Sequence, residues 1–217
     1  MKSLIFSWRI ALAVILAAAF GMSAAKAQTS LDFTPFEYEG VSNVSDLDYI
    51  DLNALVVSTV DGVTVSIRNQ STIGDPGVTL TQPTVTRIFF EDRAGVTGGQ
   101  ISIQSYDGEV SFVRNDGANL PGGRNIGFQV ESAFTATAPP SKQGLDPGES
   151  IRFLLGGTSY EHVVASLVSG DFRIAMHVQE IGRWGEDSAA FVSVIPEPGS
   201  VLPVLLSSLL LLRRRRK

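Results

Sequence analysis

Hydrophobic and polar side chains alternate along most of residues 28–195. A period of two places one face of a β-strand against a core and the other face toward solvent. Between Phe172 and Val178, for example, every second residue is large and hydrophobic. The pattern predicts about eight to ten short strands separated by turn residues. The expected strands lie at residues 34–38, 55–60, 63–68, 84–91, 101–106, 109–114, 126–134, 151–155, 172–178 and 189–195.

Asp61-Gly62 and Asp107-Gly108 each stand between two of these predicted strands. An Asp-Gly pair fits the type I′ turn that joins two antiparallel strands. The sequence therefore predicts a hairpin at each pair. Many short strands without alternating helices favour an all-β fold, and we expect an antiparallel β-sandwich of jelly-roll-like form.

One segment of this body has helical spacing. Hydrophobic residues recur from Tyr160 to Leu167 at intervals of three and four. Thr158 or Ser159 can cap the first turn, and Gly170 suits the left-handed position that follows the last turn. The sequence predicts one short helix here.

The N-terminus has the features of a secretory signal peptide. Two basic residues, Lys2 and Arg9, precede an apolar run at 10–20, and the small residues Ala25 and Ala27 follow it. Signal peptidase would cut between Ala27 and Gln28. An uncleaved anchor helix is the alternative, but the apolar run is short for that. We expect residues 1–27 to be a signal helix that the mature protein lacks.

The C-terminus has three parts in sequence. Pro196, Glu197 and Pro198 precede an almost wholly apolar segment at 199–212, and five cations end the chain. A helix over 199–212 would be roughly 21 Å long, which is short for a hydrocarbon core of about 30 Å. Cations hold their end of such a helix on the cytoplasmic side. These cations are Arg213, Arg214, Arg215, Arg216 and Lys217.

This three-part tail, residues 196–217, resembles the PEP-CTERM sorting signal. The resemblance implies an exported protein of a Gram-negative bacterium that also makes exopolysaccharide. It also implies that an exosortase-type membrane protease recognises the Pro-Glu-Pro motif and removes the transmembrane helix. An ordinary short membrane anchor with a chance Pro-Glu-Pro is the alternative interpretation.

Residues 28–195 resemble a recurrent type of PEP-CTERM ectodomain. The resemblance rests on the segments 86–92, 144–150 and 171–182, and on Asp187-Ser188 behind them. This group has no assigned activity, so the resemblance implies only a β-rich fold and export.

Charge is divided unevenly along the chain. Three of the 17 Lys and Arg residues lie in the leader and five at the end of the tail, whereas all 22 acidic residues lie between these two groups, within residues 28–198. The body is therefore strongly acidic, which disfavours nucleic acid as a partner. No cysteine is present, and this excludes disulfides, thiol nucleophiles and cysteine-ligated metals.

Neither histidine has the surroundings of a catalytic base. His177 lies on the polar side of its predicted strand, and His162 lies in the predicted helix. A base needs an orienting acid and a nucleophile nearby, and the local sequence supplies neither. We interpret His177 as a partly exposed structural residue and His162 as a solvated one, and we expect no catalytic residues and no cofactor.

Two weaker binding hypotheses concern calcium and sugars. Asp46, Asp48 and Asp51, with Asn53, are oxygen ligands at close spacing, but they lack the glycine and the distal glutamate of an EF-hand loop. A solvated acidic loop is the favoured interpretation. Sugar rings could stack on aromatic side chains, of which Trp184 in the loop 182–187 is the most suggestive. The other candidates are Tyr106 and Tyr160.

The sequence thus predicts a non-enzymatic exported protein, held transiently in the inner membrane and then delivered to the cell surface or extracellular matrix. Its expected partners are signal peptidase, an exosortase-type protease and exopolysaccharide. A carbohydrate- or calcium-binding module is the alternative. A hydrolase is the weakest hypothesis, because no particular pair of carboxylates stands out.

Overall fold

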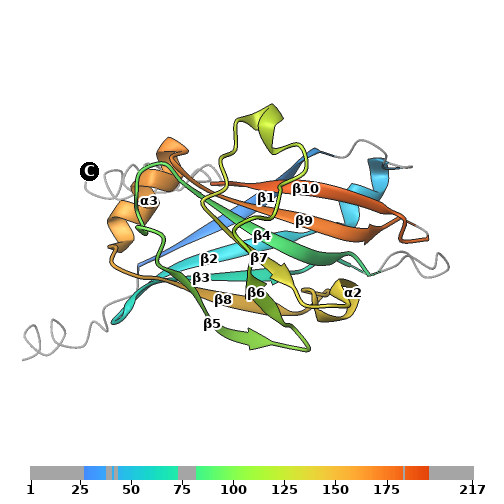
Figure 1. Ribbon diagram of the computed structural model, residues 1–217, viewed down its shortest axis with the longest axis horizontal. Helices are drawn as coiled ribbons and strands as arrows, with labels where there is room; N and C mark the ends of the chain where they lie inside the picture. Colours follow the sequence, from blue (N-terminus) through green and yellow to red (C-terminus); the bar gives the residue numbers. More distant parts are fainter. Residues whose placement is uncertain (1–26, 38–40, 42–43, 73–81, 183, 196–217) are drawn as a thin grey trace, which may run out of the picture.

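The computed structural model describes residues 27–37, 41, 44–72, 82–182 and 184–195. The predicted leader before Ala27 and the sorting tail from Pro196 lie outside these residues, and so does the basic cluster. Ten strands form a single antiparallel sheet (Figure 1). The strands are β1 (Gln28–Glu37), β2 (Leu52–Thr59), β3 (Gly62–Asn69), β4 (Thr84–Asp92), β5 (Ile101–Asp107), β6 (Phe112–Arg114), β7 (Ser132–Ala136), β8 (Ser150–Leu155), β9 (Phe172–Ile181) and β10 (Asp187–Val194).

The strand order is β5-β8-β3-β2-β1-β10-β9-β4-β7-β6. β1 connects the two halves of the sheet, because its first residues pair with β2 and its last residues pair with β10. Asp32 takes part in both pairings, opposite Asn53 on β2 and Val194 on β10. The first and last strands of the body therefore lie side by side in the middle of the sheet.

The sheet curls so that its two halves face each other around one hydrophobic core (Figure 1). Phe90 on β4 and Phe153 on β8 come from opposite halves, and their ring centroids lie 5.1 Å apart in an edge-to-face arrangement. Phe134 on β7 lies 4.9 Å from Phe153. The prediction of a mostly β, antiparallel fold is confirmed, and the sheet is continuous.

The first predicted hairpin is present, with its turn displaced by one residue. β2 pairs with β3 from Leu52 opposite Asn69 to Thr59 opposite Gly62. Val60 and Asp61 therefore form the tip, and the predicted Asp-Gly turn is wrong in this detail. Gly62 is already a strand residue with φ of 133°, and a Cβ there would lie 2.8 Å from the Leu155 carbonyl oxygen. The absence of a side chain at Gly62 therefore allows this close contact between the strands.

The second predicted hairpin is wrong. β5 pairs with β8 and β6 pairs with β7, so these consecutive strands form the two ends of the sheet. Side chains link them instead. Tyr106 Oη donates a hydrogen bond to the Phe112 carbonyl oxygen over 3.2 Å, and Arg114 Nη1 donates to the Ile101 carbonyl oxygen over 3.3 Å. Tertiary pairing with β8 and β7 overrides the local turn signal.

The long strand predicted at 126–134 is also wrong in its first half. Residues Gly123–Ile126 form the 3₁₀ helix η2, and a loop follows before β7 begins at Ser132. Gly127 has φ of 59°, outside the extended region. Phe128 packs against a different face of the sheet from Phe134, because the two side chains belong to separate hydrophobic clusters.

The predicted helix is confirmed as α3 (Tyr160–Ser169). Ser159 caps it by accepting a hydrogen bond from the His162 backbone N–H over 3.2 Å, and Gly170 follows with φ of 77°. Three helical turns were not predicted, namely η1 (Val44–Tyr49), η2 and α2 (Pro140–Gln143). Within the described part of the chain, every helix is too short or too polar to cross a bilayer.

Candidate binding cleft

A second buried face lies on the outside of the half-sheet that contains β4, β9 and β10. Residues 115–131, here called the β6–β7 loop, cross this face (Figure 1). The loop contributes Phe128 to a hydrophobic cluster with Phe89, Ala133 and Ala175. Both faces of this half-sheet are therefore covered, one by the opposite half and the other by the loop.

One end of the β6–β7 loop is held by a buried carboxylate. Glu91 on β4 is 0% exposed. Its Oε1 accepts hydrogen bonds from Arg93 Nε over 2.9 Å and from the Gln129 backbone N–H over 2.7 Å. Its Oε2 accepts a hydrogen bond from Arg173 on β9. We call these three side chains, Glu91, Arg93 and Arg173, the arginine clamp.

The two guanidinium groups of the clamp also bind the loop backbone. Arg173 donates to the carbonyl oxygens of Ile126, over 3.2 Å, and Gly127, over 3.0 Å. Arg93 donates to the same Gly127 oxygen. The Arg173 guanidinium carbon lies 5.1 Å from the centre of the Phe128 ring, in a cation–π position. The clamp thus fixes both the backbone and the buried ring of the loop.

The other end of the loop is held by Asp116. Its carboxylate accepts hydrogen bonds from Arg114 Nε over 2.8 Å and from the Ala133 backbone N–H over 3.2 Å. Partial burial by itself raises the pKa of Asp116. The two hydrogen bonds and the charge of Arg114 outweigh it, so the pKa lies below its usual value. Asp116 is therefore ionised and paired at neutral pH.

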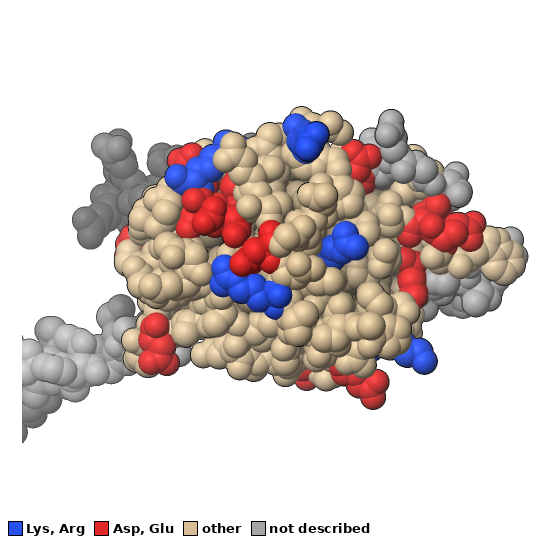
Figure 2. Space-filling model, viewed as in Figure 1, with Lys and Arg blue, Asp and Glu red and all other residues tan. Residues whose placement is uncertain are grey.

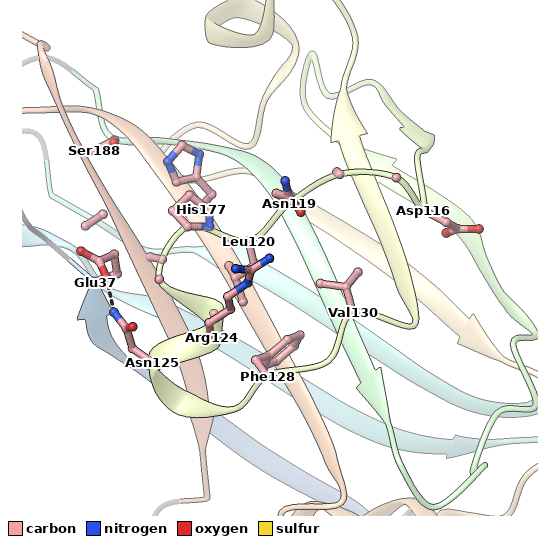
Figure 3. A pocket seen from close by; sticks show the side chains of 17 residues that line it. Glu37, Asp116, Asn119, Leu120, Arg124, Asn125, Phe128, Val130, His177 and Ser188 are labelled. Carbon is pink, nitrogen blue, oxygen red and sulfur yellow. Dashed lines mark hydrogen bonds between the residues drawn. The ribbon is translucent and has the colours of Figure 1, made fainter.

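Between these two anchors the loop arches away from the sheet and leaves a cleft of about 870 Å³. Its walls are loop residues and its base is formed by β9 and β10, with Glu37 of β1 at one side (Figure 3). Figure 3 shows Asp116 at the far end of the cleft from Glu37. Ligand sites commonly have volumes of about 300–1,000 Å³, so the cleft has the size of a small-molecule site.

A contact in the middle of the loop closes the Glu37 side of the cleft. Asn125 Nδ2 donates a hydrogen bond to Glu37 Oε2 over 3.1 Å (Figure 3). The Glu37 side chain also lies against the backbone of Gly122, where a Cβ would come within 2.2 Å of Oε2. Gly122 has φ of 63° as well. A glycine is required there for both reasons.

Strand register places a histidine and a carboxylate on one row of the sheet. Glu37 on β1 pairs with Ala190 on β10, and Ala190 pairs with His177 on β9. Paired residues project to the same face of a sheet. The next partner across is Arg87 on β4. At the base of the cleft, Ala190 thus lies between Glu37 and His177 in one row.

His177 is buried at this base. It is 6% exposed, so the prediction of a partly exposed histidine is wrong. The polar face of its strand is covered by the β6–β7 loop, which strand periodicity does not show. Burial, and next the positive charge of Arg87, lower the pKa of His177 to about 4 from an ordinary 6.5. The imidazole is therefore neutral at pH 7.

The hydrogen bonds of Thr86 indicate the tautomer of His177. Thr86 Oγ1 donates to the His177 carbonyl oxygen over 3.4 Å and lies 3.5 Å from Nδ1. A hydroxyl has one hydrogen, so toward Nδ1 it acts as an acceptor, and we assign the proton to Nδ1. Nε2 has no hydrogen-bond partner among the residues that the structure describes. Every fully buried polar side-chain atom in those residues does have a partner, so Nε2 is not fully buried. Nε2 is therefore open to the cleft as an acceptor.

Three further polar side chains line the cleft and are exposed, namely Asn119, Arg124 and Ser188. Their side chains make no hydrogen bond to any other described residue. Figure 3 shows them around the same opening as His177, on the loop, on η2 and at the start of β10. No signal in the sequence indicated that the β6–β7 loop faces His177.

The acidic residues considered for calcium do not form a metal site in the described chain. Asp46 and Asp48 lie on η1, and Asp51 precedes β2. No group of three or more Asp, Glu or His side chains within the described ranges is close enough to hold a metal ion. His162 is exposed on α3, in agreement with its prediction.

The aromatic residues proposed for sugar stacking lie apart from the cleft. Tyr160 Oη hydrogen-bonds with Thr29 Oγ1 at 2.7 Å, and Tyr106 hydrogen-bonds with β6. Trp184 is 72% exposed in the turn between β9 and β10. None of these three lines the cleft, so the structure does not bring the predicted stacking residues together.

Charged side chains of both signs are interspersed on one face of the molecule. On the face shown in Figure 2, basic side chains lie singly or beside acidic ones on a mostly uncharged surface. This distribution differs from the continuous basic patch typical of nucleic-acid-binding proteins.

No protein family, curated protein or solved structure was found to match this chain. The site must therefore be interpreted from its own geometry.

Proposed function

We propose that this chain is an exported, non-catalytic surface protein whose β body associates with exopolysaccharide. In this proposal signal peptidase removes residues 1–27. The tail holds the protein transiently in the inner membrane until an exosortase-type protease acts at Pro196-Glu197-Pro198. The observation that carries the proposal is the three-part tail, combined with a leader of the secretory type.

The boundaries of the described body support this proposal. β1 begins at Gln28, the expected first residue of the mature protein, and β10 ends at Val194, two residues before the Pro-Glu-Pro motif. Both expected cuts fall outside the sheet, so neither would remove a paired strand. We also propose that the curled sheet is a flattened jelly-roll-like sandwich, since rings from its opposite halves are in contact.

The test is the intact mass of the protein recovered from the surface and medium of producing cells. We expect a chain that begins at Gln28 and ends near Pro196. A mass that still includes residues 205–217 would overturn the sorting proposal in favour of a permanent anchor. Replacing Pro196, Glu197 and Pro198 with alanine should leave the tail attached. Glu186→Ala, at an exposed acid of the body, is the matched control and should be processed normally.

The calcium alternative has no group of ligands in the described residues to support it. The carbohydrate alternative is supported by one specific observation, which is the polar cleft under the β6–β7 loop.

A further inference from the structure

The cleft presents hydrogen-bonding groups that the fold itself does not use. His177 is more than nine-tenths buried, yet its Nε2 faces the cleft without a partner in the described chain. Leaving such an acceptor unpaired costs free energy unless water or a ligand reaches it. At the base of the cleft, water or a ligand therefore supplies the donor that this nitrogen lacks.

The groups around the opening suit a ligand that both donates and accepts hydrogen bonds. Arg124 can only donate, His177 Nε2 can only accept with its proton on Nδ1, and the amide of Asn119 and the hydroxyl of Ser188 do both. These side chains come from separate elements and face the same space (Figure 3). Hydroxyl groups satisfy all of them, because each hydroxyl donates one hydrogen and accepts at its oxygen.

The charge and the apolar surface of the cleft limit the class of ligand further. Glu37 and Arg124 contribute one charge of each sign to the cleft, and Asp116 is paired with Arg114. The site is thus close to neutral, while the body as a whole is acidic and repels polyanions. Leu120 and Val130 add half-buried apolar surface to the same cleft, which suits the C–H face of a saturated ring.

We propose that the cleft between the β6–β7 loop and strands β9 and β10 binds a neutral saccharide. One ring hydroxyl donates to His177 Nε2, and Asn119, Arg124 and Ser188 hold the hydroxyls nearer the opening. This inference names the site for the proposed association with exopolysaccharide, and it rests on that part of the proposed function and not on the sorting of the chain.

The test is isothermal titration calorimetry on the full-length chain in a detergent without a sugar headgroup, since such a headgroup would compete. The probes are neutral hexasaccharides of glucose and of N-acetylglucosamine in different linkages, with a hexauronate as the charged comparison. We expect at least one neutral hexasaccharide to bind, and we expect the hexauronate to bind about tenfold more weakly or not at all.

Variants at the opening locate the site. Asn119→Ala and Arg124→Ala should each weaken binding about tenfold, because each removes a hydrogen bond worth roughly 1–1.5 kcal/mol. Both side chains are exposed and unbonded within the described chain, so the melting temperature should not change. Gln104→Ala and Arg152→Ala replace an exposed amide side chain on β5 and an exposed arginine on β8, and these variants should bind like the unmodified chain.

The possible outcomes separate this inference from the proposed function. Weaker binding in the two cleft variants alone supports the inference. Equal binding in all variants overturns the site but leaves an association with polysaccharide standing. Binding of the hexauronate alone overturns the proposal that the ligand is neutral. No binding of any saccharide overturns both the inference and the polysaccharide part of the proposed function, whereas the sorting of the chain is decided by the mass measurement.

Discussion

The two faces of the half-sheet formed by β4, β9 and β10 are both buried, but by different means. The inner face carries large hydrophobic side chains such as Phe90, Phe172 and Ile174, which pack against the opposite half of the sheet. The outer face carries Glu91, Arg173 and His177, and a loop covers it. The inner face forms the hydrophobic core of the body, whereas the outer face positions a loop and leaves a cleft beneath it.

The largest effect should come from the inner face. Phe90→Ala removes a fully buried ring that contacts Phe134, Phe153 and Phe172, and we expect it to lower the free energy of unfolding by about 3–5 kcal/mol. Urea denaturation measures this. Val113→Ala, at a side chain that is 52% exposed, should cost less than about 0.5 kcal/mol. Equal costs for the two variants would contradict the assignment of the core.

The arginine clamp should have the next largest effect. Glu91→Gln leaves Arg93 and Arg173 without their buried carboxylate, and we expect a loss of about 2 kcal/mol. This is less than for a fully buried pair, because the Arg93 and Arg173 side chains are 42% and 20% exposed. Hydrogen exchange should also become faster at the Gln129 amide. Glu131→Gln, at an exposed acid of the same loop, is the control and should change neither quantity.

His177 should make stability depend on pH. Its pKa is about 4 in the folded chain and near 6.5 when unfolded. Protonation therefore favours the unfolded chain, and the contribution of the neutral imidazole is complete above pH 6.5 and is lost as the pH falls toward 4. We expect roughly 2 kcal/mol of acid destabilisation between pH 7 and pH 5 from this group.

Comparison with variants isolates this contribution from that of the carboxylates. His177→Gln should reduce the slope of unfolding free energy against pH in this window, when urea denaturation is repeated at several pH values. His162→Gln, at the exposed histidine of α3, should leave the slope unchanged. The same slope in both variants would show that His177 titrates as if it were in water.

The smallest effect is a difference between two glycine variants, and it concerns the contact between Glu37 and Gly122. Gly122→Ala should cost about 1 kcal/mol for its left-handed backbone, plus a similar amount because the new Cβ displaces the Glu37 side chain. Gly95→Ala is a matched control, because Gly95 has nearly the same φ, 64°, and open space around its Cβ position. The difference between the two variants in thermal unfolding measures the closeness of the Glu37 contact. No difference would show that Glu37 moves aside freely.

Strand periodicity was sufficient to predict the inner face and insufficient to predict the outer one. The alternation of hydrophobic and polar residues in the sequence predicts the burial of Phe172 and Ile174. The burial of His177 depends on a loop about 50–60 residues earlier in the chain, and no local pattern carries that information. Likewise the Asp107-Gly108 signal was overridden, because β5 and β6 found partners elsewhere in the sheet. Local propensity is a weak guide where tertiary pairing decides the outcome.

The adjacency of β1 and β10 has a consequence for how this chain reaches its folded state. The middle of the sheet joins the earliest and the latest strands of the body, and such distant pairings are slow to form. During synthesis the N-terminal strands are made first, so the sheet cannot close before residues 187–194 are available. Until then β1 and β9 each lack a neighbour and the core is incomplete. The body can therefore complete its native sheet only after its whole length has been made.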